Sequence, residues 1–239
     1  MVTREEGDGV VVVAIPRTMT PEGMGELVEA LGLSPRRAFV LTGTGSAFCL
    51  GADLKWLGAE ADAGEAVGRL VARHHDVVRA MRAVAVPVVT AINGAAAGGG
   101  MSLALAGDYC LAASQATFTA AYFRLGLTPD GGNSLFLRRL VGPAKAMELL
   151  LRNNTLTAVE ARELGLVGEV VAGEALLDRA VELLAGFAAV PAETLRTTRR
   201  LLDGGLEEQL RAEAAAVTAA ARRPEFAAAL RGFLERSGR

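Results

Sequence analysis

The sequence of 239 residues is poor in cysteine, lysine and aromatic residues, and each shortage excludes a class of protein. Its two cysteines, Cys49 and Cys110, are too few for a disulfide framework and predict a reducing compartment. Only Lys55 and Lys145 are lysines, and the formal net charge is −2. No global basic field would therefore attract nucleic acid or an anionic membrane. Aromatic residues make up 5%, which argues against an aromatic-rich binding surface.

Long uninterrupted apolar runs are also missing. The first residues are acidic, and the apolar run 10–15 is too short for the core of a signal peptide. The most apolar long stretch, 84–113, is interrupted by Pro87, Asn93, the glycine triplet 98–100 and Asp108, so it predicts buried core and not a membrane span. We expect a cytoplasmic protein with no nucleic-acid partner and no membrane partner.

Several common functional motifs are absent. The sequence has no phosphate-binding Gly-x-x-x-x-Gly-Lys loop, no Gly-x-Gly-x-x-Gly and no Gly-x-Ser-x-Gly. His74 and His75 are adjacent, and consecutive residues of a helix point in different directions. We therefore predict that they lie on a solvated helix face and do not form a metal pair. The cysteines lack the spacing of metal ligands, so no metal site is expected.

The first half of the sequence alternates short β-branched runs with helical stretches, and the second half is mostly helical. The predicted strands are 10–15, 38–42, 87–92 and 108–113, and the predicted helices between them are 21–31, 61–83 and 101–106. After about residue 143 strand signals almost vanish, and the predicted helices are 174–187, 193–202, 207–221 and 224–236. The pattern indicates an α/β fold, with a core over residues 1–190 and a helical region over 191–239.

Three loops crowded with small residues adjoin these elements, at 43–55, 93–102 and 125–133. Glycine lets the backbone approach a ligand closely, so bare N–H groups can point at one oxygen atom. Two such donors form an oxyanion hole. The alternative is that glycines 98–100 only allow a helix to pack closely on a sheet, and this triplet alone favours neither interpretation.

The loop sequences resemble the crotonase superfamily of enoyl-CoA hydratases and isomerases. The segments that carry the resemblance, in the family's order, are AFCLGADLK at 47–55, PVVTAING at 87–94 with glycines 98–100, LGLTPDGG at 125–132, LTAVEA at 156–161 with GLV at 165–167, and GFLE at 232–235. The resemblance implies repeated ββα units followed by a C-terminal helical region that forms trimer contacts or a lid. It also implies a homotrimer or a dimer of trimers. The substrate would be an acyl-CoA thioester, with no further cofactor because coenzyme A is part of the substrate.

The resemblance also assigns roles within the first two loops. The backbone N–H groups of Ala52 and Gly99 would hold the thioester oxygen while it becomes an enolate. The substrate-binding stretch beside them would consist of Ala52, Asp53, Leu54 and Lys55. From the residues alone, Asp53 is expected to cap a loop. Cys49 is expected to be a small buried side chain and not a nucleophile.

The two glutamates of a typical family hydratase fall at Ser102 and Tyr122, and neither residue is a carboxylate. A tyrosine with an ordinary pKa of about 10 is a poor base at neutral pH, so Tyr122 is expected to donate a hydrogen bond or to line the substrate pocket. Typical hydratase chemistry is therefore disfavoured.

Asp130 matches the place where Δ3-Δ2-enoyl-CoA isomerases carry their single acidic residue. It would remove a proton alpha to the thioester and return it at the gamma carbon, and apolar neighbours would raise its pKa toward the working pH. The alternative role for Asp130 is that of a turn residue, because Pro-Asp-Gly is a common turn sequence. The sequence predicts an isomerase. The alternatives are a hydratase with atypical acid and base groups and a non-catalytic acyl-CoA-binding protein.

Overall fold

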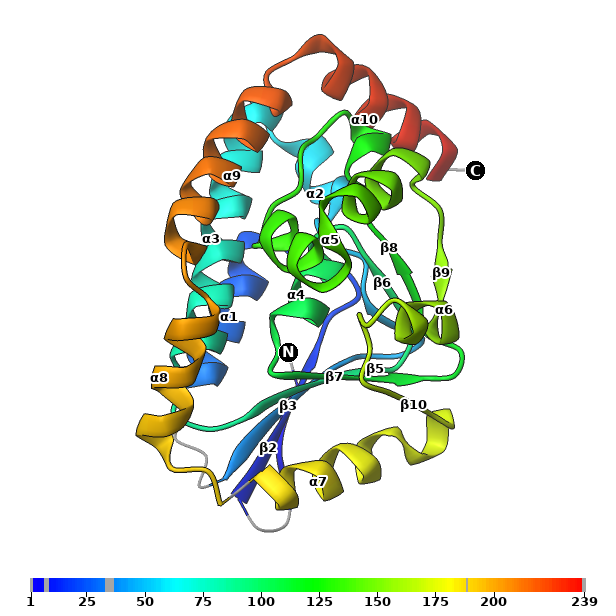
Figure 1. Ribbon diagram of the computed structural model, residues 1–239. Helices are drawn as coiled ribbons and strands as arrows, with labels where there is room; N and C mark the ends of the chain where they lie inside the picture. The colour runs from blue at the N-terminus through cyan, green and yellow to red at the C-terminus, as the bar shows by residue number, and fades with distance from the viewer. Residues whose placement is uncertain (1, 7–8, 33–36, 188, 238–239) are drawn as a thin grey trace.

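A computed structural model describes residues 2–6, 9–32, 37–187 and 189–237 (Figure 1). Two sheets organise the chain. The strand order of the six-stranded sheet is β1 (Val2–Glu6), β2 (Val10–Ile15), β3 (Ala38–Gly43), β5 (Val88–Ile92), β7 (Tyr109–Ala113) and β10 (Glu169–Val171). The four-stranded sheet has the order β4 (Ala47–Cys49), β6 (Ala95–Ala97), β8 (Thr117–Thr119) and β9 (Leu156–Thr157). Among the strand pairs of the described residues, β1–β2 and β8–β9 are antiparallel and the others are parallel.

One unit recurs three times along the chain. A strand joins the large sheet, a short strand joins the small sheet, and a helix follows. The first unit consists of β3, β4, α2 (Leu54–Ala59) and α3 (Ala63–Ala83). The second consists of β5, β6 and α4 (Gly99–Ala106). The third consists of β7, β8, the 3-10 turn η2 (Phe123–Leu125) and α5 (Asn133–Arg152). The predicted α/β class with repeated ββα units is therefore confirmed.

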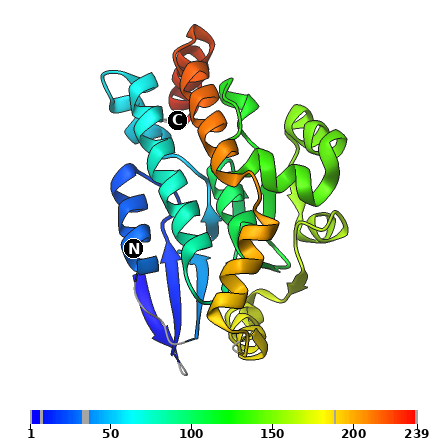
Figure 2. The ribbon, with the colours of Figure 1, turned by 60° about the vertical axis from the view of Figure 1, so that its left-hand side comes forward.

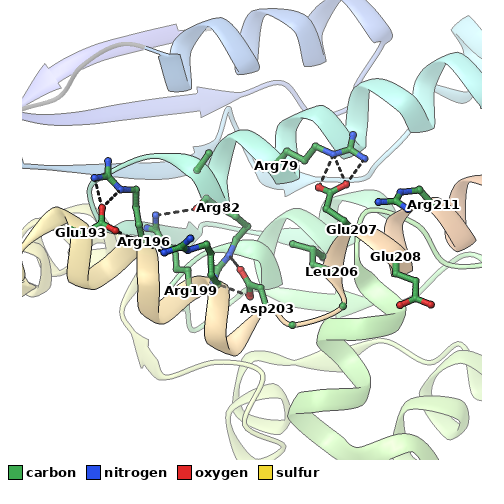
Figure 3. A pocket seen from close by; sticks show the side chains of 14 residues that line it. Arg79, Arg82, Glu193, Arg196, Arg199, Asp203, Leu206, Glu207, Glu208 and Arg211 are labelled. Carbon is green, nitrogen blue, oxygen red and sulfur yellow. Dashed lines mark hydrogen bonds and ion pairs between the residues drawn. The ribbon is translucent and has the colours of Figure 1, made fainter.

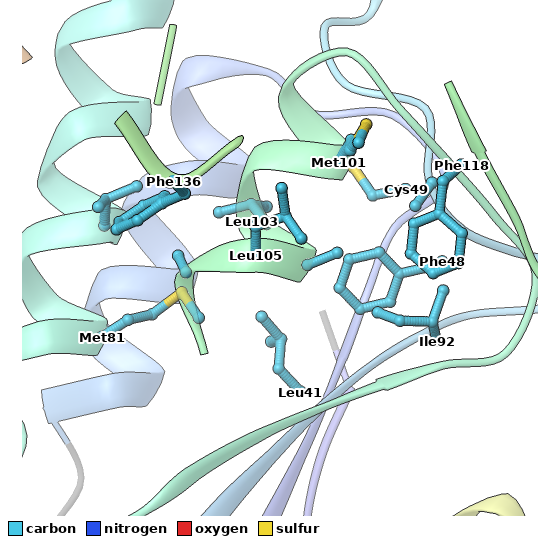
Figure 4. Packing of buried hydrophobic residues seen from close by; sticks show 14 of the residues in the cluster. Leu41, Phe48, Cys49, Met81, Ile92, Met101, Leu103, Leu105, Phe118 and Phe136 are labelled. Carbon is cyan, nitrogen blue, oxygen red and sulfur yellow. The ribbon is translucent and has the colours of Figure 1, made fainter. Parts of the chain in front are cut away.

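Helices cover both faces of the large sheet. Val11 and Val13 of β2 point into the main core with α1 (Pro21–Gly32), α3 and α4, while Val10 and Val12 face α7 (Leu176–Phe187). Figure 4 shows the main core, in which the side chains of α4 lie between the strands and α3. Because both faces are buried, these strands are continuous apolar runs in the sequence and not alternating ones.

The C-terminal helices pack on the first half of the chain. They follow α6 (Ala158–Glu163) and the turn η3 (Gly173–Ala175), and they are α8 (Ala192–Leu202), α9 (Leu206–Ala221) and α10 (Pro224–Ser237). Helix α9 runs along α3 (Figure 2), and Val217 of α9 joins Val67 and Val71 of α3 in one buried cluster. Helix α10 packs on α2 and η2. The last part of the chain thus lies against the helix that follows the first loop.

The predicted strands and helices are present, and six further strands within the described residues were not predicted: β1, β4, β6, β8, β9 and β10. The expectation that strands end near residue 143 is wrong, because β9 and β10 lie beyond it. They have two and three residues, too few to show a period, and they form only because β8 and β7 offer free edges. Among the described residues, no helix combines the length and apolarity needed to cross a membrane.

Candidate active site

The first two glycine-rich loops are in contact. A Cβ atom on Gly51 would lie 3.0 Å from the amide nitrogen of Gly99, and one on Gly100 would lie 1.9 Å from the carbonyl oxygen of Cys49. Gly51 and Gly98 also have positive φ values of +82° and +52°, which L side chains rarely adopt. The close approach of the two backbones therefore requires glycine at these positions.

Two backbone N–H groups in these loops are free. Ala52 lies between Gly51, whose carbonyl accepts from the Met19 N–H at 2.9 Å, and Asp53, whose N–H donates to the Met19 carbonyl at 2.9 Å. Gly99 is the first residue of α4, so its N–H has no acceptor within the helix and lies at the positive end of the helix dipole. Within the described residues, neither the Ala52 nor the Gly99 amide donates a hydrogen bond.

The stretch that follows Ala52 begins α2. Asp53 is the N-cap of this helix, as predicted: its Oδ1 accepts from the N–H groups of Lys55 and Trp56 at 2.9 Å each, and Thr18 donates to its Oδ2 at 2.9 Å. Burial raises the pKa of Asp53, but these hydrogen bonds outweigh it and leave the pKa below its usual value. Leu54 packs against the cluster that α2 shares with α9 and α10.

Asp130, from the third loop, is 7% exposed and is held by three side chains. The Tyr122 hydroxyl donates to Asp130 Oδ1 at 3.1 Å, and His74 Nδ1 lies 3.4 Å from the same oxygen. Ser102 Oγ donates to the Asp130 backbone carbonyl at 2.9 Å and lies 2.5 Å from the Tyr122 hydroxyl. Both its carboxylate and its main chain are therefore fixed.

These contacts reverse the expected shift of the Asp130 pKa. Burial raises the pKa of Asp130. The hydrogen bond and charge of His74, the charge of His75 and the hydrogen bond of Tyr122 lower it, and together they outweigh burial, so the pKa lies below its usual value. The expectation that apolar neighbours would raise this pKa is therefore wrong. The sequence shows the apolar neighbours, but the two histidines and the tyrosine reach Asp130 only through the fold.

Tyr122 is the hydrogen-bond donor that the sequence suggested. Burial, and after it the charge of Asp130, raises the pKa of Tyr122 well above its usual value. The phenol therefore stays protonated and donates to Asp130 instead of acting as a base. Cys49 is equally inert, because burial raises its pKa to about 11.

His74 and His75 do not lie on a solvated face: they are 1% and 2% exposed, so that prediction is wrong. A Cβ atom on Gly99 would lie 3.1 Å from His74 Cε1, and one on Gly131 would lie 2.2 Å from the same atom. The imidazole of His74 therefore packs against the loop 93–102 and the loop 125–133 that carries Asp130. A signal was present, because His74 is three residues after the buried Val71 and continues the apolar stripe of α3.

Figure 3 shows a cavity of about 1120 Å³ at the other end of α3, beside the α8–α9 junction. None of the candidate site residues lines it. Two of its arginines form ion pairs: Arg79 with Glu207 at 2.9 Å, and Arg82 with Asp203 at 2.7 Å. At this cavity, ion pairs therefore join the end of α8 and the start of α9 to α3, away from the contact between the three loops.

Residues 8–238 match the family model described as enoyl-CoA hydratase/isomerase. The chain belongs to this family. A probable enoyl-CoA hydratase of Rhodobacter capsulatus is 35% identical over 243 residues, which cover 97% of the chain and 94% of that protein. The 1,2-epoxyphenylacetyl-CoA isomerase of Escherichia coli is 41% identical over 160 residues, which are 65% of the chain. The match covers 60% of that relative, less than two thirds of its length.

A solved structure shows the same fold. The monofunctional enoyl CoA isomerase from M. smegmatis superposes with a TM-score of 0.70 at 31% identity, covering 86% of this chain and 93% of that one. The crotonase fold is therefore confirmed, and the chain belongs to a family of enzymes that is named for acting on enoyl-CoA. Hydratase and isomerase names both occur among its relatives, so the names leave its particular reaction open.

Proposed function

We propose that this family member is an isomerase that moves a double bond of an enoyl-CoA from the Δ3 to the Δ2 position. One observation carries the proposal: Ser102 and Tyr122, where a hydratase would hold its two acids, both hydrogen-bond Asp130. A hydratase needs two carboxylates to position and deprotonate a water molecule. Here both positions support a third residue, and a single carboxylate is enough for proton transfer between two carbons.

In this reaction the thioester oxygen would accept hydrogen bonds from the N–H groups of Ala52 and Gly99. The coenzyme A portion would pass along the stretch that ends at Lys55, with Tyr122 beside the acyl group. When Asp130 removes the alpha proton, the C–H electrons move toward the thioester oxygen and form a dienolate. Each donor to that oxygen is worth roughly 3–4 kcal/mol in comparable enzymes. Asp130, now protonated, returns the proton at the gamma carbon.

His74 and Tyr122 serve Asp130 as positioning residues. Both place a polar atom within 3.4 Å of Asp130 Oδ1, which fixes the direction of that carboxylate. Together they lower its pKa, so the carboxylate is ionised and ready to accept a proton at neutral pH. A homotrimer or a dimer of trimers, with contacts from residues 191–239, belongs to the same proposal and rests on the resemblance alone.

The proposal is tested by incubating the purified protein with 3-enoyl-CoA thioesters of short to long acyl chain in D₂O, followed by NMR and mass spectrometry. We expect the 2-enoyl-CoA, with deuterium at the alpha or gamma carbon and no water added. Addition of water would show that Ser102 and Tyr122 permit hydration, and the hydratase alternative would replace the proposal. Binding of every thioester without turnover would instead support a non-catalytic acyl-CoA-binding protein.

A further inference from the structure

The backbone that follows Asp130 is held by side chains from two distant helices. The N–H of Gly131 donates to His75 Nε2 of α3 at 3.1 Å. The N–H groups of Gly132 and Ser134 donate to the two carboxylate oxygens of Glu213 on α9, at 2.7 and 3.0 Å. Three of the four N–H groups after Asp130 are therefore bound by side chains that do not belong to their own loop.

Glu213 acts as the N-terminal cap of α5 from another helix. The N-cap residue of α5 is Gly132, which has a φ of +78° and no side chain to accept a hydrogen bond. The first N–H groups of a helix lack partners within the helix, and a carboxylate is favoured there by the helix dipole. Glu213 is 4% exposed, and it also accepts from the Ser134 hydroxyl, to which Gln209 of α9 donates at 2.8 Å.

His75 completes this arrangement as a neutral ring. Because its Nε2 accepts from the Gly131 N–H, that nitrogen carries no proton. Burial, and after it the charge of His74, lowers the pKa of His75 to about 4. Its Nε2 also lies 3.7 Å from Glu213 Oε2, so the two acceptors take adjacent N–H groups of the same loop.

We propose that Glu213 is a positioning residue for the reaction: through the N–H groups of Gly132 and Ser134 it fixes the loop that carries Asp130. The C-terminal helical region would thereby contribute to the active site by holding the loop that carries Asp130. The proposed effect on turnover rests on the proposed function of Asp130, whereas the effect on the loop does not. A displacement of about 1 Å in a reacting group can cost up to about 100-fold in rate, so loss of this support should appear in kcat.

The test compares Glu213→Gln and Glu213→Ala with Glu208→Gln, a matched control because Glu208 is exposed on the same helix. In Glu213→Gln one carboxylate oxygen becomes an NH₂ group, which cannot accept an N–H. In the isomerase assay we expect both Glu213 variants to lose about 10- to 100-fold in kcat with KM within about twofold. The control should match the parent. In an Asp130→Asn background, Glu213→Gln should cause no further loss, because it acts through Asp130.

Amide hydrogen exchange gives a second readout that does not depend on activity. The amides of Gly131, Gly132 and Ser134 should exchange faster in the Glu213 variants than in the parent. In Glu208→Gln their exchange rates should be the same as in the parent. Unchanged exchange there, or unchanged kcat in both Glu213 variants while Asp130→Asn is inactive, would overturn the positioning role. If Asp130→Asn keeps full activity, the proposed function fails, and the exchange data alone decide whether Glu213 holds the loop. Should Glu213→Ala not fold, Glu213→Gln carries both readouts.

Discussion

The loops 43–55 and 93–102 lie beside the Asp130 loop in the candidate site, but different contacts hold them in place. Gly100 leaves no room for a Cβ atom and Gly51 leaves little, so backbone contacts set how closely the first two loops approach each other. Asp130 is instead fixed by side chains: Tyr122 and His74 at its carboxylate and Ser102 at its carbonyl. A donor pair made of backbone keeps its geometry whatever side chains surround it, whereas a carboxylate can be retuned by any one of its neighbours.

This comparison explains how one fold can carry different reactions. The proposed oxyanion donors belong to main chain whose close approach leaves little or no space for a Cβ atom at Gly51 and Gly100. The proposed proton-transferring group, Asp130, depends instead on the side chains at positions 102 and 122, which here are Ser102 and Tyr122. Substitutions in the loops 43–55 and 93–102 should therefore mainly reduce folding stability, whereas substitutions around Asp130 should mainly reduce turnover.

The largest expected effect is on turnover. Asp130→Asn keeps the size of the side chain but removes the base, so kcat in the isomerase assay should fall by about 10³-fold, with folding and thioester binding retained. Asp178→Asn is the matched control, because Asp178 is exposed on α7, on the other face of the large sheet. Full activity of Asp130→Asn would return Asp130 to the role of a turn residue.

The next effect concerns the backbone contact. In Gly100→Ala the new Cβ would lie 1.9 Å from the carbonyl oxygen of Cys49, so one of two backbones must move. We expect the free energy of unfolding to fall by about 3 kcal/mol in a denaturant titration. Gly25→Ala in α1, where no atom lies within 4 Å of the new Cβ, should instead raise it by about 0.5–1 kcal/mol. Equal results for the two variants would refute the packing argument.

A smaller effect should appear in stability as a function of pH. The pKa of His75 falls from 6.5 to about 4 on folding. Between these values the unfolded chain binds a proton that the folded chain does not, so stability is full above pH 6.5 and is lost as the pH falls toward 4. In His75→Gln, which keeps an acceptor for Gly131 but does not titrate, this loss should be smaller by roughly 2 kcal/mol.

Other titratable and charged groups beside His75 also affect how stability depends on pH, so a comparison with a variant is needed. Burial raises the pKa of Glu213. A raised carboxyl pKa favours the folded protein at low pH, which is opposite to the effect of His75. His74, Asp76, Arg79 and Asp130 also act on His75. The prediction therefore concerns the difference between the parent and His75→Gln, measured by urea unfolding at each pH. An identical pH slope in both proteins would contradict it.

The smallest effect tests how Tyr122 tunes Asp130. Tyr122→Phe removes one hydrogen bond to the carboxylate, which should cost about tenfold in kcat. Because that bond lowers the pKa of Asp130, its loss should raise the pKa, and the acidic limb of the kcat/KM profile should move to higher pH. Tyr109→Phe, which changes a phenol on β7, serves as the control. An unchanged acidic limb in Tyr122→Phe would show that the phenol does not reach the working carboxylate.

Local sequence patterns predict the longer strands and α3 near the site, but not the short strands β4, β6 and β8 or the helices α2 and α5. The strand predicted at 10–15 is β2 with the same bounds, and the helix predicted at 61–83 begins two residues later because the Asp62 side chain accepts from the Glu65 N–H and caps it. The strands β9 and β10 escaped prediction because their length carries no period and their partners lie elsewhere in the chain. Glu213 escaped too, because nothing in a helix rich in alanine and glutamate distinguishes a buried glutamate from an exposed one.

The sequence by itself determined the three loops, the glycines on which two backbones meet, and the place of Asp130 in a Pro-Asp-Gly-Gly turn. Only the tertiary structure decided the environment of Asp130. His75 is 56 residues away from Gly131, and Glu213 is 81 residues away from Gly132. Close backbone packing leaves a local mark, because only glycine fits. The charge and pKa of a buried carboxylate instead depend on whichever side chains the fold brings within a few ångströms of it.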